Sequence, residues 1–367
     1  MSSAPSPLPP PAAPAPPPAP PSDEAAEAPR RRVRLRDVVW PVLLSLAVIV
    51  GILTFTTDGE ELARVARQFR PGLLALAVGA LVLQVGAAAV RLRHIAQGML
   101  TLRQAVRAQI SWDFLSSITP SALGGGPFAA VLISRENKLP LGRVSALMLF
   151  SMLMDQVWFA TLIVALFGLA TVLPVFPTAL GAASIGTVVL YLVGLLAWIA
   201  FFATATLFRP DLIEWAAQKV VRIKWLRRFE GFVMTETTKL KRQAKILRGQ
   251  PLRFYAVGFG LTMVVWCSRY AIALYSAYAV ASIARPVLFY FRTAALWLVG
   301  LVMPTPGGSG GMEGLYLLFL APLLPEGTAG AALLGWRMIA YYLVLVVGAF
   351  VAGTAVRELF FGGRKDA

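Results

Sequence analysis

The sequence predicts an all-α polytopic membrane protein, and two observations lead to this prediction. Hydrophobic residues make up 57% of the 367 residues and charged residues only 14%, which leaves more apolar surface than a water-soluble core could bury. Several stretches of about 18 or more residues carry no charge, enough at about 1.5 Å per residue to cross roughly 30 Å of hydrocarbon. Because backbone groups in lipid must pair within their own segment, we expect these stretches to be helices.

Six stretches are predicted to cross the membrane completely, within a transmembrane domain of residues 30–357. They are Val38–Phe55, Gly72–Val90, Val144–Leu173, Ala179–Phe208, Phe254–Ala284 and Ala329–Val356. The domain is flanked by residues 1–29, which hold twelve of the 26 prolines and are expected to be disordered, and by a short tail of residues 358–367.

The positive charge indicates orientation rather than nucleic-acid binding. The formal net charge is +16, but lysine and arginine gather at the ends of apolar segments instead of forming a basic domain. The arginines at 30–36 precede the first span, and others follow the last one. By the positive-inside rule, we expect a multi-pass protein of the cytoplasmic membrane with both termini in the cytoplasm and no nucleic-acid partner.

Two further apolar segments are interrupted by proline and glycine. The first, at about 108–134, contains TPSALGGGP (Thr119–Pro127), and the second, at about 287–324, contains MPTPGGSGGMEG (Met303–Gly314). Such clusters break helices. If the first segment crossed fully, the loop at 210–253, with eleven Lys/Arg against four Asp/Glu, would lie outside. Re-entrant hairpins keep this basic loop in the cytoplasm.

The two interrupted segments are predicted to belong to inverted-topology repeats. Each is preceded by one spanning helix and followed by another that carries a lone charge, Asp155 in the first unit and Arg337 in the second. With the topology above, one unit runs in the opposite direction to the other. Secondary transporters commonly have this architecture, with a site where discontinuous helices meet near the bilayer midplane.

The glycine runs are the first candidates for substrate binding. They are Gly124, Gly125 and Gly126 followed by Pro127, and Gly307, Gly308, Gly310 and Gly311 preceded by Pro306. Each run comes just before a returning half-helix, whose free N–H groups and positive dipole end would suit an anionic headgroup. The alternative interpretation is that these glycines only permit tight turns and close helix packing.

Charged residues within apolar segments are the second set of candidates. Asp155, Arg269 and Arg337 fall near the middle of their spans, and Asp113, Arg292 and Glu313 fall within the interrupted segments. Each costs about 2.5 to 3.5 kcal/mol at the bilayer centre, so these side chains must face a cavity or one another. We expect Arg269 and Arg337 to contact a phosphate, with Glu313 and Asp155 balancing them or contacting a cationic headgroup. Static ion pairing between helices is the alternative.

Signals for catalysis are missing from the sequence. It has no phosphate-binding loop, no metal-ligand cluster and no nucleophile with a plausible base, and its single histidine, His94, lies among arginines at a predicted membrane edge. We therefore expect no catalytic residue, no metal and no cofactor. The basic loop at 210–253 interleaves aromatic residues with lysine and arginine, which fits either an interfacial helix on anionic lipid or a solvated loop.

The interrupted segments resemble a known family, the flippase-like transmembrane region of lysylphosphatidylglycerol synthases, in its stand-alone form. The resemblance is carried by Ile118–Leu149 and by Met303–Gly314 with Arg337 downstream. It implies a path for lipid headgroups along Pro306, Gly307, Gly308, Glu313 and Arg337. Where relatives often have an acidic or amide residue after the first glycines, this chain has Gly126 and Pro127, which leaves the backbone for contact there. The chain ends after the last span without a synthase domain, so synthase activity is not expected.

The sequence as a whole favours a transporter of a phospholipid, an aminoacyl-phospholipid or a polyprenyl-phosphate-linked lipid. Its expected partners are membrane lipids with an anionic or phosphate-bearing headgroup and a cytoplasmic lipid synthase or glycosyltransferase. Two alternatives remain open at this point: a secondary transporter of a small polar solute, and a membrane scaffold for a lipid or glycosyl transferase that binds through the loop at 210–253.

Overall fold

A computed structural model describes residues 67, 69–119, 125–177, 181–204, 230–301, 303 and 305–361, with isolated positions between 209 and 219. All of these belong to the second of two compact units, which covers residues 32–367. The predicted disordered tail, the first predicted span Val38–Phe55, Gly124 and the last six residues lie outside the described part of the chain.

Long apolar helices dominate the described residues, as the sequence predicted. The longest elements are α3 (Pro71–Ile95), α6 (Leu141–Ala170), α7 (Gly181–Ala203), α10 (Leu252–Val280) and a final continuous rod. This rod consists of α13 (Ala329–Arg337), the π-helical η6 (Met338–Leu343) and α14 (Val344–Phe361). Four of these elements, namely α3, α6, α10 and the final rod, are long and apolar enough to cross a membrane. The prediction of an all-α polytopic membrane protein is confirmed.

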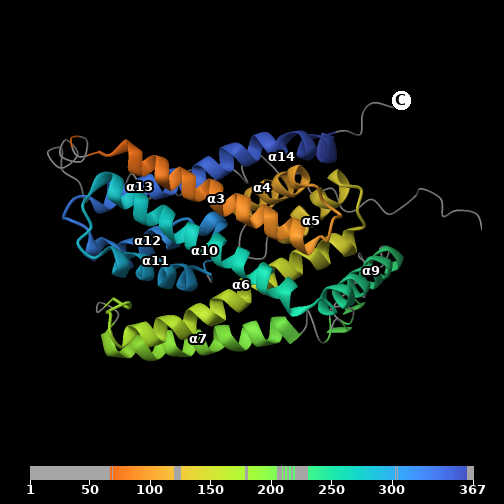
Figure 1. Ribbon diagram of the computed structural model, residues 1–367, viewed down its shortest axis with the longest axis horizontal. Coiled ribbons are helices and arrows are strands. Elements are labelled where there is room, and N and C mark those ends of the chain that lie inside the picture. Colours follow the sequence, from red (N-terminus) through yellow and green to blue (C-terminus); the bar gives the residue numbers. More distant parts are fainter. Residues whose placement is uncertain are drawn as a thin grey trace, which may run out of the picture. The chain divides into compact units, whose positions relative to one another are not determined.

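The helices α3 and α10 lie side by side and run in opposite directions (Figure 1). At one end, the backbone N–H of Arg70 donates to the carbonyl of Ala279 over 2.8 Å. At the other end, Nε2 of His94 lies 3.0 Å from the carbonyl oxygen of Phe254, and the two rings stack. Buried alanines on both helices contribute to the shared core, and small side chains of this kind let two backbones approach closely.

The first interrupted segment forms a helical hairpin. It consists of α4 (Leu102–Ile118) and α5 (Gly125–Glu136), so it begins about six residues earlier than the sequence indicated, where Thr101 caps the helix through Gln104. Gly125 lies directly against the backbone of Ser116 near the break, and Arg107 pairs with Glu136 at 3.6 Å near the other end. The two helices are therefore antiparallel and return to the level at which they started.

The second interrupted segment folds in the same way. Helix α11 (Pro286–Gly300) is followed by the short 3-10 turn η4 (Pro306–Gly308), by α12 (Gly311–Phe319) and by a second short turn, η5 (Ala321–Leu323). Gly300 lies against Met312 near the break. Arg292, in the first half of α11, donates to the carbonyl of Phe319 at the end of α12 over 3.1 Å. Both interrupted segments are thus helical hairpins.

The helix that follows the first hairpin runs parallel to α10. Phe150 of α6 lies beside Phe254, with ring centroids 5.8 Å apart, and Nε1 of Trp158 donates to the hydroxyl of Tyr270 over 3.2 Å. Both pairs advance in the same direction along the two helices. Since α3 is antiparallel to α10, the first unit consists of a helix, a hairpin and a helix that returns against the first.

The helix that follows the second hairpin runs parallel to α3. Gly335 of α13 lies near Leu74 at the start of α3, whereas Ala352 of α14 belongs to the same core cluster as Ile95 at its end. Each helix of the second unit therefore runs opposite to its counterpart in the first. This confirms the predicted inverted repeat, which rested on the sequence layout alone.

The hairpins enter the helical domain from opposite ends, and their inner parts meet. Helix α4 starts after the end of α3, near Phe254, whereas α11 starts after the other end of α10, near Arg70. The turn η4 of the second hairpin contacts α4 of the first. Gly348 of α14 also lies directly against Phe114 of α4. The two breaks are thereby brought toward a shared region of the fold.

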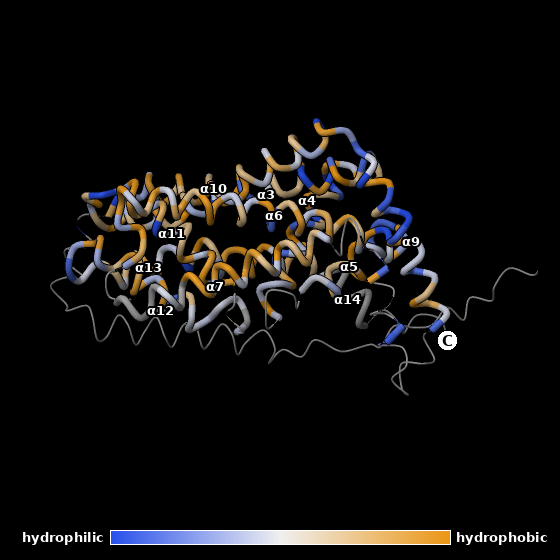
Figure 2. The backbone as a smooth tube through the Cα atoms, turned by 90° about the horizontal axis from the view of Figure 1, so that it is seen from below, coloured by the Kyte–Doolittle hydropathy of each residue, from blue (hydrophilic) through white to orange (hydrophobic). Residues whose placement is uncertain are grey.

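Part of the basic loop forms a polar helix against the long apolar ones. Helix α9 (Glu230–Arg248) packs on α6, where the N–H of Gly142 donates to Oε2 of Glu236 over 2.6 Å. Figure 2 shows the hydrophilic colouring of α9 against the mostly hydrophobic colouring of α3, α6 and α10. Lysines and arginines line much of this helix, in keeping with a position outside the hydrocarbon.

The contact between Gly348 and Phe114 predicts a matched pair of substitutions in α14. A Cβ atom at Gly348 would collide with the Phe114 side chain, whereas one at Gly353 meets nothing within 4 Å. We expect Gly348→Val to destabilise the protein by about 1 to 3 kcal/mol through overpacking, and Gly353→Val to change stability little. Thermal unfolding in detergent measures both. Equal unfolding midpoints for the two variants would contradict this docking of α14 on α4.

Candidate functional site

A bidentate ion pair joins α3 to α6 inside the helical domain. Arg91, 4% exposed, donates from Nη1 to Oδ1 of Asp155 over 2.6 Å and from Nη2 to Oδ2 over 3.3 Å. Nη1 also donates to the hydroxyl of Thr262 on α10 over 2.9 Å, and the indole N–H of Trp266 donates to Oδ1 of Asp155 over 2.9 Å. Three long helices are therefore held together by one pair of charges.

Arg91 is a residue that the sequence reasoning placed elsewhere. The predicted second span, Gly72–Val90, leaves Arg91 just outside the membrane. The helix continues to Ile95, so Arg91 lies within it and is buried. The signal that could have found it is the need of Asp155 for a counter-charge, but the sequence does not say which arginine supplies one.

Arg269 lies close to this pair and is held by aromatic rings. Its guanidinium carbon is 4.8 Å from the ring centroid of Trp266 and 4.9 Å from that of Trp297. The side chain is half-buried, and it forms no hydrogen bond or ion pair with the residues that the structure describes. The charges of Asp113, Asp155 and Arg91 are near enough to act on it.

Asp113 brings the first hairpin into the same region. It lies on α4, half-buried, and accepts a hydrogen bond from Nε2 of Gln109 over 3.0 Å. The charges of Arg269, Arg91 and Asp155 act on it, but it forms no ion pair within the described residues. The predicted candidates Asp155 and Arg269 are therefore brought together, and Arg91 and Asp113 join them.

The candidates Glu313 and Arg337 form a second buried pair. Nη2 of Arg337 lies 2.7 Å from Oε2 of Glu313, and the two residues are 4% and 0% exposed. The same carboxylate oxygen accepts the backbone N–H of Gly310 over 2.8 Å. Nη1 of Arg337 donates to the carbonyl of Gly307 over 3.2 Å. This pair therefore fixes the conformation of the glycine-rich break between α11 and α12.

The glycines of the second break are required by conformation and by packing. Gly307, Gly308 and Gly310 have φ values of +58°, +68° and +85°, in the left-handed region that glycine adopts most readily. A Cβ atom at Gly307 would collide with the ring of Tyr341, which lies in the π-helical turn just after Arg337. Gly311 lies against Met303 at the start of α12. These observations fit the alternative interpretation, tight turns and close packing, and substrate binding by this run stays a prediction.

The first glycine run lies at the start of a helix, as predicted. Gly125, Gly126 and Pro127 form the first turn of α5, where proline needs no N–H partner. Gly125 is buried against Ser116, whereas Pro127 is exposed. Of the two breaks, the second is the one whose loop the described charges stabilise directly.

Aromatic rings connect Arg269 to the pair Glu313–Arg337. The ring of Trp297, which stacks on Arg269, lies 6.3 Å from the ring of Trp336 in an edge-to-face arrangement. Trp336 in turn lies under the guanidinium of Arg337, at 5.4 Å, and stacks on Tyr316 at 5.2 Å. The sequence reasoning did not identify these tryptophans, since aromatic residues at helical spacing usually form core.

Arg292, the remaining intramembrane arginine of the prediction, binds backbone carbonyls. It donates from Nε and Nη2 to Pro174, at 3.1 and 2.9 Å, and from Nη1 to Phe319. These carbonyls lie in the segment after α6 and at the end of α12. Arg292 thus satisfies backbone carbonyls near the ends of helices and belongs to neither charged pair.

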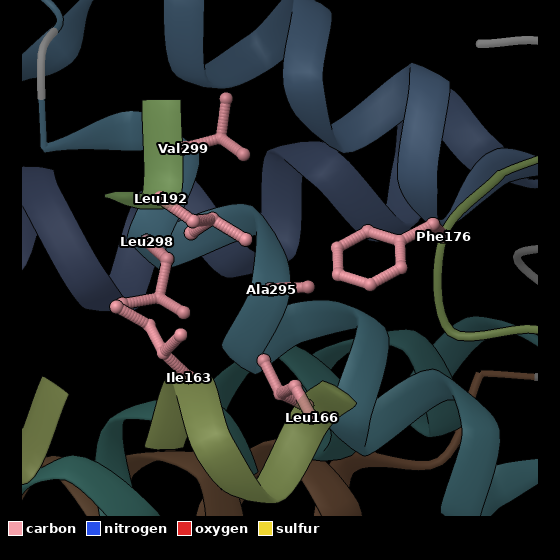
Figure 3. Close-up of a pocket in the computed structure, with 7 residues that line it drawn as sticks. All are labelled: Ile163, Leu166, Phe176, Leu192, Ala295, Leu298 and Val299. Atoms are coloured by element: carbon pink, nitrogen blue, oxygen red, sulfur yellow. The ribbon is translucent and has the colours of Figure 1, made fainter. Parts of the chain in front are cut away.

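A small pocket outside the charged region is lined only by hydrophobic side chains. It lies between α6, α7 and α11 and beside the segment that follows α6 (Figure 3). Its lining residues are Ile163, Leu166, Phe176, Leu192, Ala295, Leu298 and Val299. Such a lining suits hydrocarbon and offers nothing to a polar ligand. Within the described part of the chain, no three His, Cys, Asp or Glu side chains are grouped to hold a metal ion.

Comparisons with known proteins agree with the resemblance noted in the sequence. The family described as "Lysylphosphatidylglycerol synthase TM region" matches residues 42–348. A UPF0104 membrane protein from Archaeoglobus fulgidus is 26% identical over 245 residues, which is 64% of this chain and 71% of the relative. No solved structure matches the chain significantly.

The buried pair Glu313–Arg337 predicts strongly non-additive substitutions. Glu313→Ala or Arg337→Ala leaves the other charge without its partner, so each is expected to destabilise the protein by about 3 to 5 kcal/mol. The double variant should lose less stability than the two single variants lose together, because it leaves no buried charge without a partner. Thermal unfolding of the four proteins forms the cycle. Lys241→Gln, which removes a partly exposed ion pair with Asp211, is the control and should change little. Additive losses would contradict the coupling.

Proposed function

Because the chain belongs to the lysylphosphatidylglycerol synthase transmembrane-region family, we propose that it is a flippase-like transporter. Its substrate is a phospholipid, an aminoacyl-phospholipid or a polyprenyl-phosphate-linked lipid, which it moves between the leaflets of the cytoplasmic membrane. The proposal rests above all on one observation: two helical hairpins enter from opposite ends of an inverted repeat, and the second contacts the first beside buried charges. The role is not catalytic in this proposal, and both termini lie in the cytoplasm.

Inverted hairpins suit alternating access. Two units of opposite direction can tilt against each other around a fixed central site, which faces one leaflet and then the other. The pair Arg91–Asp155 links α3 and α6 of the first unit to α10 of the second through Thr262 and Trp266. In this mechanism, these hydrogen bonds rearrange as the units move, while Glu313 and Arg337 keep the second break in shape.

The outer surface of the long helices favours a lipid over a polar solute. Val82 of α3 is 66% exposed and Phe350 of α14 is 80% exposed. Lipid tails can remain against such surfaces while only the headgroup meets the buried charges. The proposed transport therefore requires no enclosed polar cavity of the kind that a water-soluble solute would occupy.

Translocation in reconstituted vesicles tests the proposed function. Purified protein in liposomes that contain a fluorescent phospholipid should speed the exchange of label between leaflets, measured by bleaching the outer leaflet with a membrane-impermeant reductant. Glu313→Gln should slow this exchange at least about tenfold, because a neutral amide loses the charge-assisted hydrogen bonds that shape the second break. Protein-free liposomes and liposomes with Lys241→Gln are the controls.

The outcome that contradicts transport is also clear. The proposed function is wrong if the native protein exchanges lipid no faster than protein-free liposomes do. This must hold for phospholipids and for a polyprenyl phosphate alike. Unchanged exchange in Glu313→Gln, with normal thermal unfolding, removes the second break from the mechanism.

The basic helix α9 supports a second candidate function, that of a scaffold. Its lysines and arginines could hold a cytoplasmic lipid synthase or glycosyltransferase, or rest on anionic lipid. If the protein is only a scaffold, replacing Lys245 and Arg248 by glutamine should abolish capture of a co-expressed lipid synthase or glycosyltransferase, while Glu313→Gln should leave the capture unchanged.

A further inference from the structure

The intramembrane charges are not equivalent once their contacts are considered. Arg91 and Asp155 bind each other in a bidentate pair. Glu313 and Arg337 pair with each other and with the backbone of the glycine-rich break. Each of these four charges thus has an ionic partner within the protein, and Arg292 donates to backbone carbonyls.

Two charges of opposite sign are left in the same region. Arg269 on α10 and Asp113 on α4 form no ion pair with each other or with any other described residue, although each acts electrostatically on the other. Both are half-buried, so both have some access from outside the packed core. A charge inside a membrane domain must be compensated, which means that a ligand of opposite charge at each of them would be stabilising.

The surroundings of Arg269 suit a phosphate. Two tryptophan rings, each about 5 Å from its guanidinium carbon, compensate part of the positive charge through their faces. Cation–π contact uses none of the N–H donors of the guanidinium, no described residue accepts from them, and their fork geometry matches two oxygens of a phosphate. The Nε1 atom of Trp297 is buried and has no hydrogen-bond partner among the described residues, so it offers one more donor nearby.

The surroundings of Asp113 suit a cation. One oxygen accepts from Gln109, and the carboxylate has further acceptor positions that no described side chain fills. Because Asp113 belongs to the first hairpin and Arg269 to the helix before the second, a ligand that touches both would bridge the two inverted units. A headgroup with a phosphate at one end and an ammonium at the other has the required pair of charges.

We propose that Arg269 and Asp113 form a two-pole site for a zwitterionic phospholipid headgroup, with the phosphate on Arg269 and the ammonium on Asp113. This inference rests on the proposed function for its physiological setting, but the binding selectivity that it predicts does not require transport. It narrows the substrate classes, since a polyprenyl phosphate bearing a neutral sugar has no group for Asp113.

Binding of short-chain lipids in detergent tests the site directly. The probes are dihexanoyl phosphatidylethanolamine and dihexanoyl phosphatidylglycerol, which share a phosphate but differ in the ammonium, with affinity measured by titration of the thermal unfolding midpoint. We expect the native protein to bind the ethanolamine lipid about tenfold more tightly, as one charge-assisted contact implies. Asp113→Asn should bring the two affinities together. Arg269→Gln should weaken the binding of both lipids. Arg269→Lys should restore only part of the lost affinity.

The matched controls replace an arginine and a carboxylate that lie outside the site. Arg253→Gln changes an exposed arginine at the start of α10, and Glu326→Gln changes an exposed carboxylate after the second hairpin. Both should keep the native selectivity. Equal affinity of the native protein for the two lipids, or selectivity that survives Asp113→Asn, overturns the inference. Native selectivity without lipid exchange in vesicles would instead refute transport and leave the two-pole site standing.

Discussion

A charge inside an apolar helical domain must find a counter-charge, and this constraint governs the arrangement of the protein. Asp155 in the middle of α6 is stable because Arg91 of α3 meets it with two hydrogen bonds, and Thr262 and Trp266 of α10 complete the set. Taking charges out of water is so costly that removing either partner would leave an uncompensated ion. The ion pair thus specifies which three helices pack together, while buried alanines between α3 and α10 set how closely they approach.

The same constraint acts differently at the second break. Glu313 and Arg337 are directed at backbone groups of a loop that lacks helical hydrogen bonds, and they satisfy the N–H of Gly310 and the carbonyl of Gly307. The glycines provide the positive φ angles, and the ion pair holds them. In the second hairpin, this pairing lets the chain turn inside the helical domain while Gly307 and Gly310 keep hydrogen-bond partners. Together with the family of the chain, this arrangement supports transport of a headgroup past the hydrocarbon.

Charges that are already paired shape the protein, and charges that remain unpaired can meet a ligand. This distinction separates the candidates that the sequence treated alike. Arg337 was expected to contact phosphate, but its donors are directed to Glu313 and to the break. Arg269 was given the same role, and its guanidinium contacts two tryptophan rings but forms no hydrogen bond or ion pair with the described residues. The contacts therefore favour a positioning role for the first and a binding role for the second.

The sequence alone determined the class of fold, four of the predicted spans and the two interrupted segments, because lipid requires long apolar helices and proline with glycine breaks them. It also indicated the inverted repeat from the order of spans and basic loops. It could not show that Arg91 belongs to the interior, since one helical turn beyond Val90 decides this, or that the charges of Asp113 and Arg269 act on each other. Only the tertiary structure settles these points, because ion pairing depends on which helices become neighbours, and residues separated by 64 or 171 positions meet only after packing.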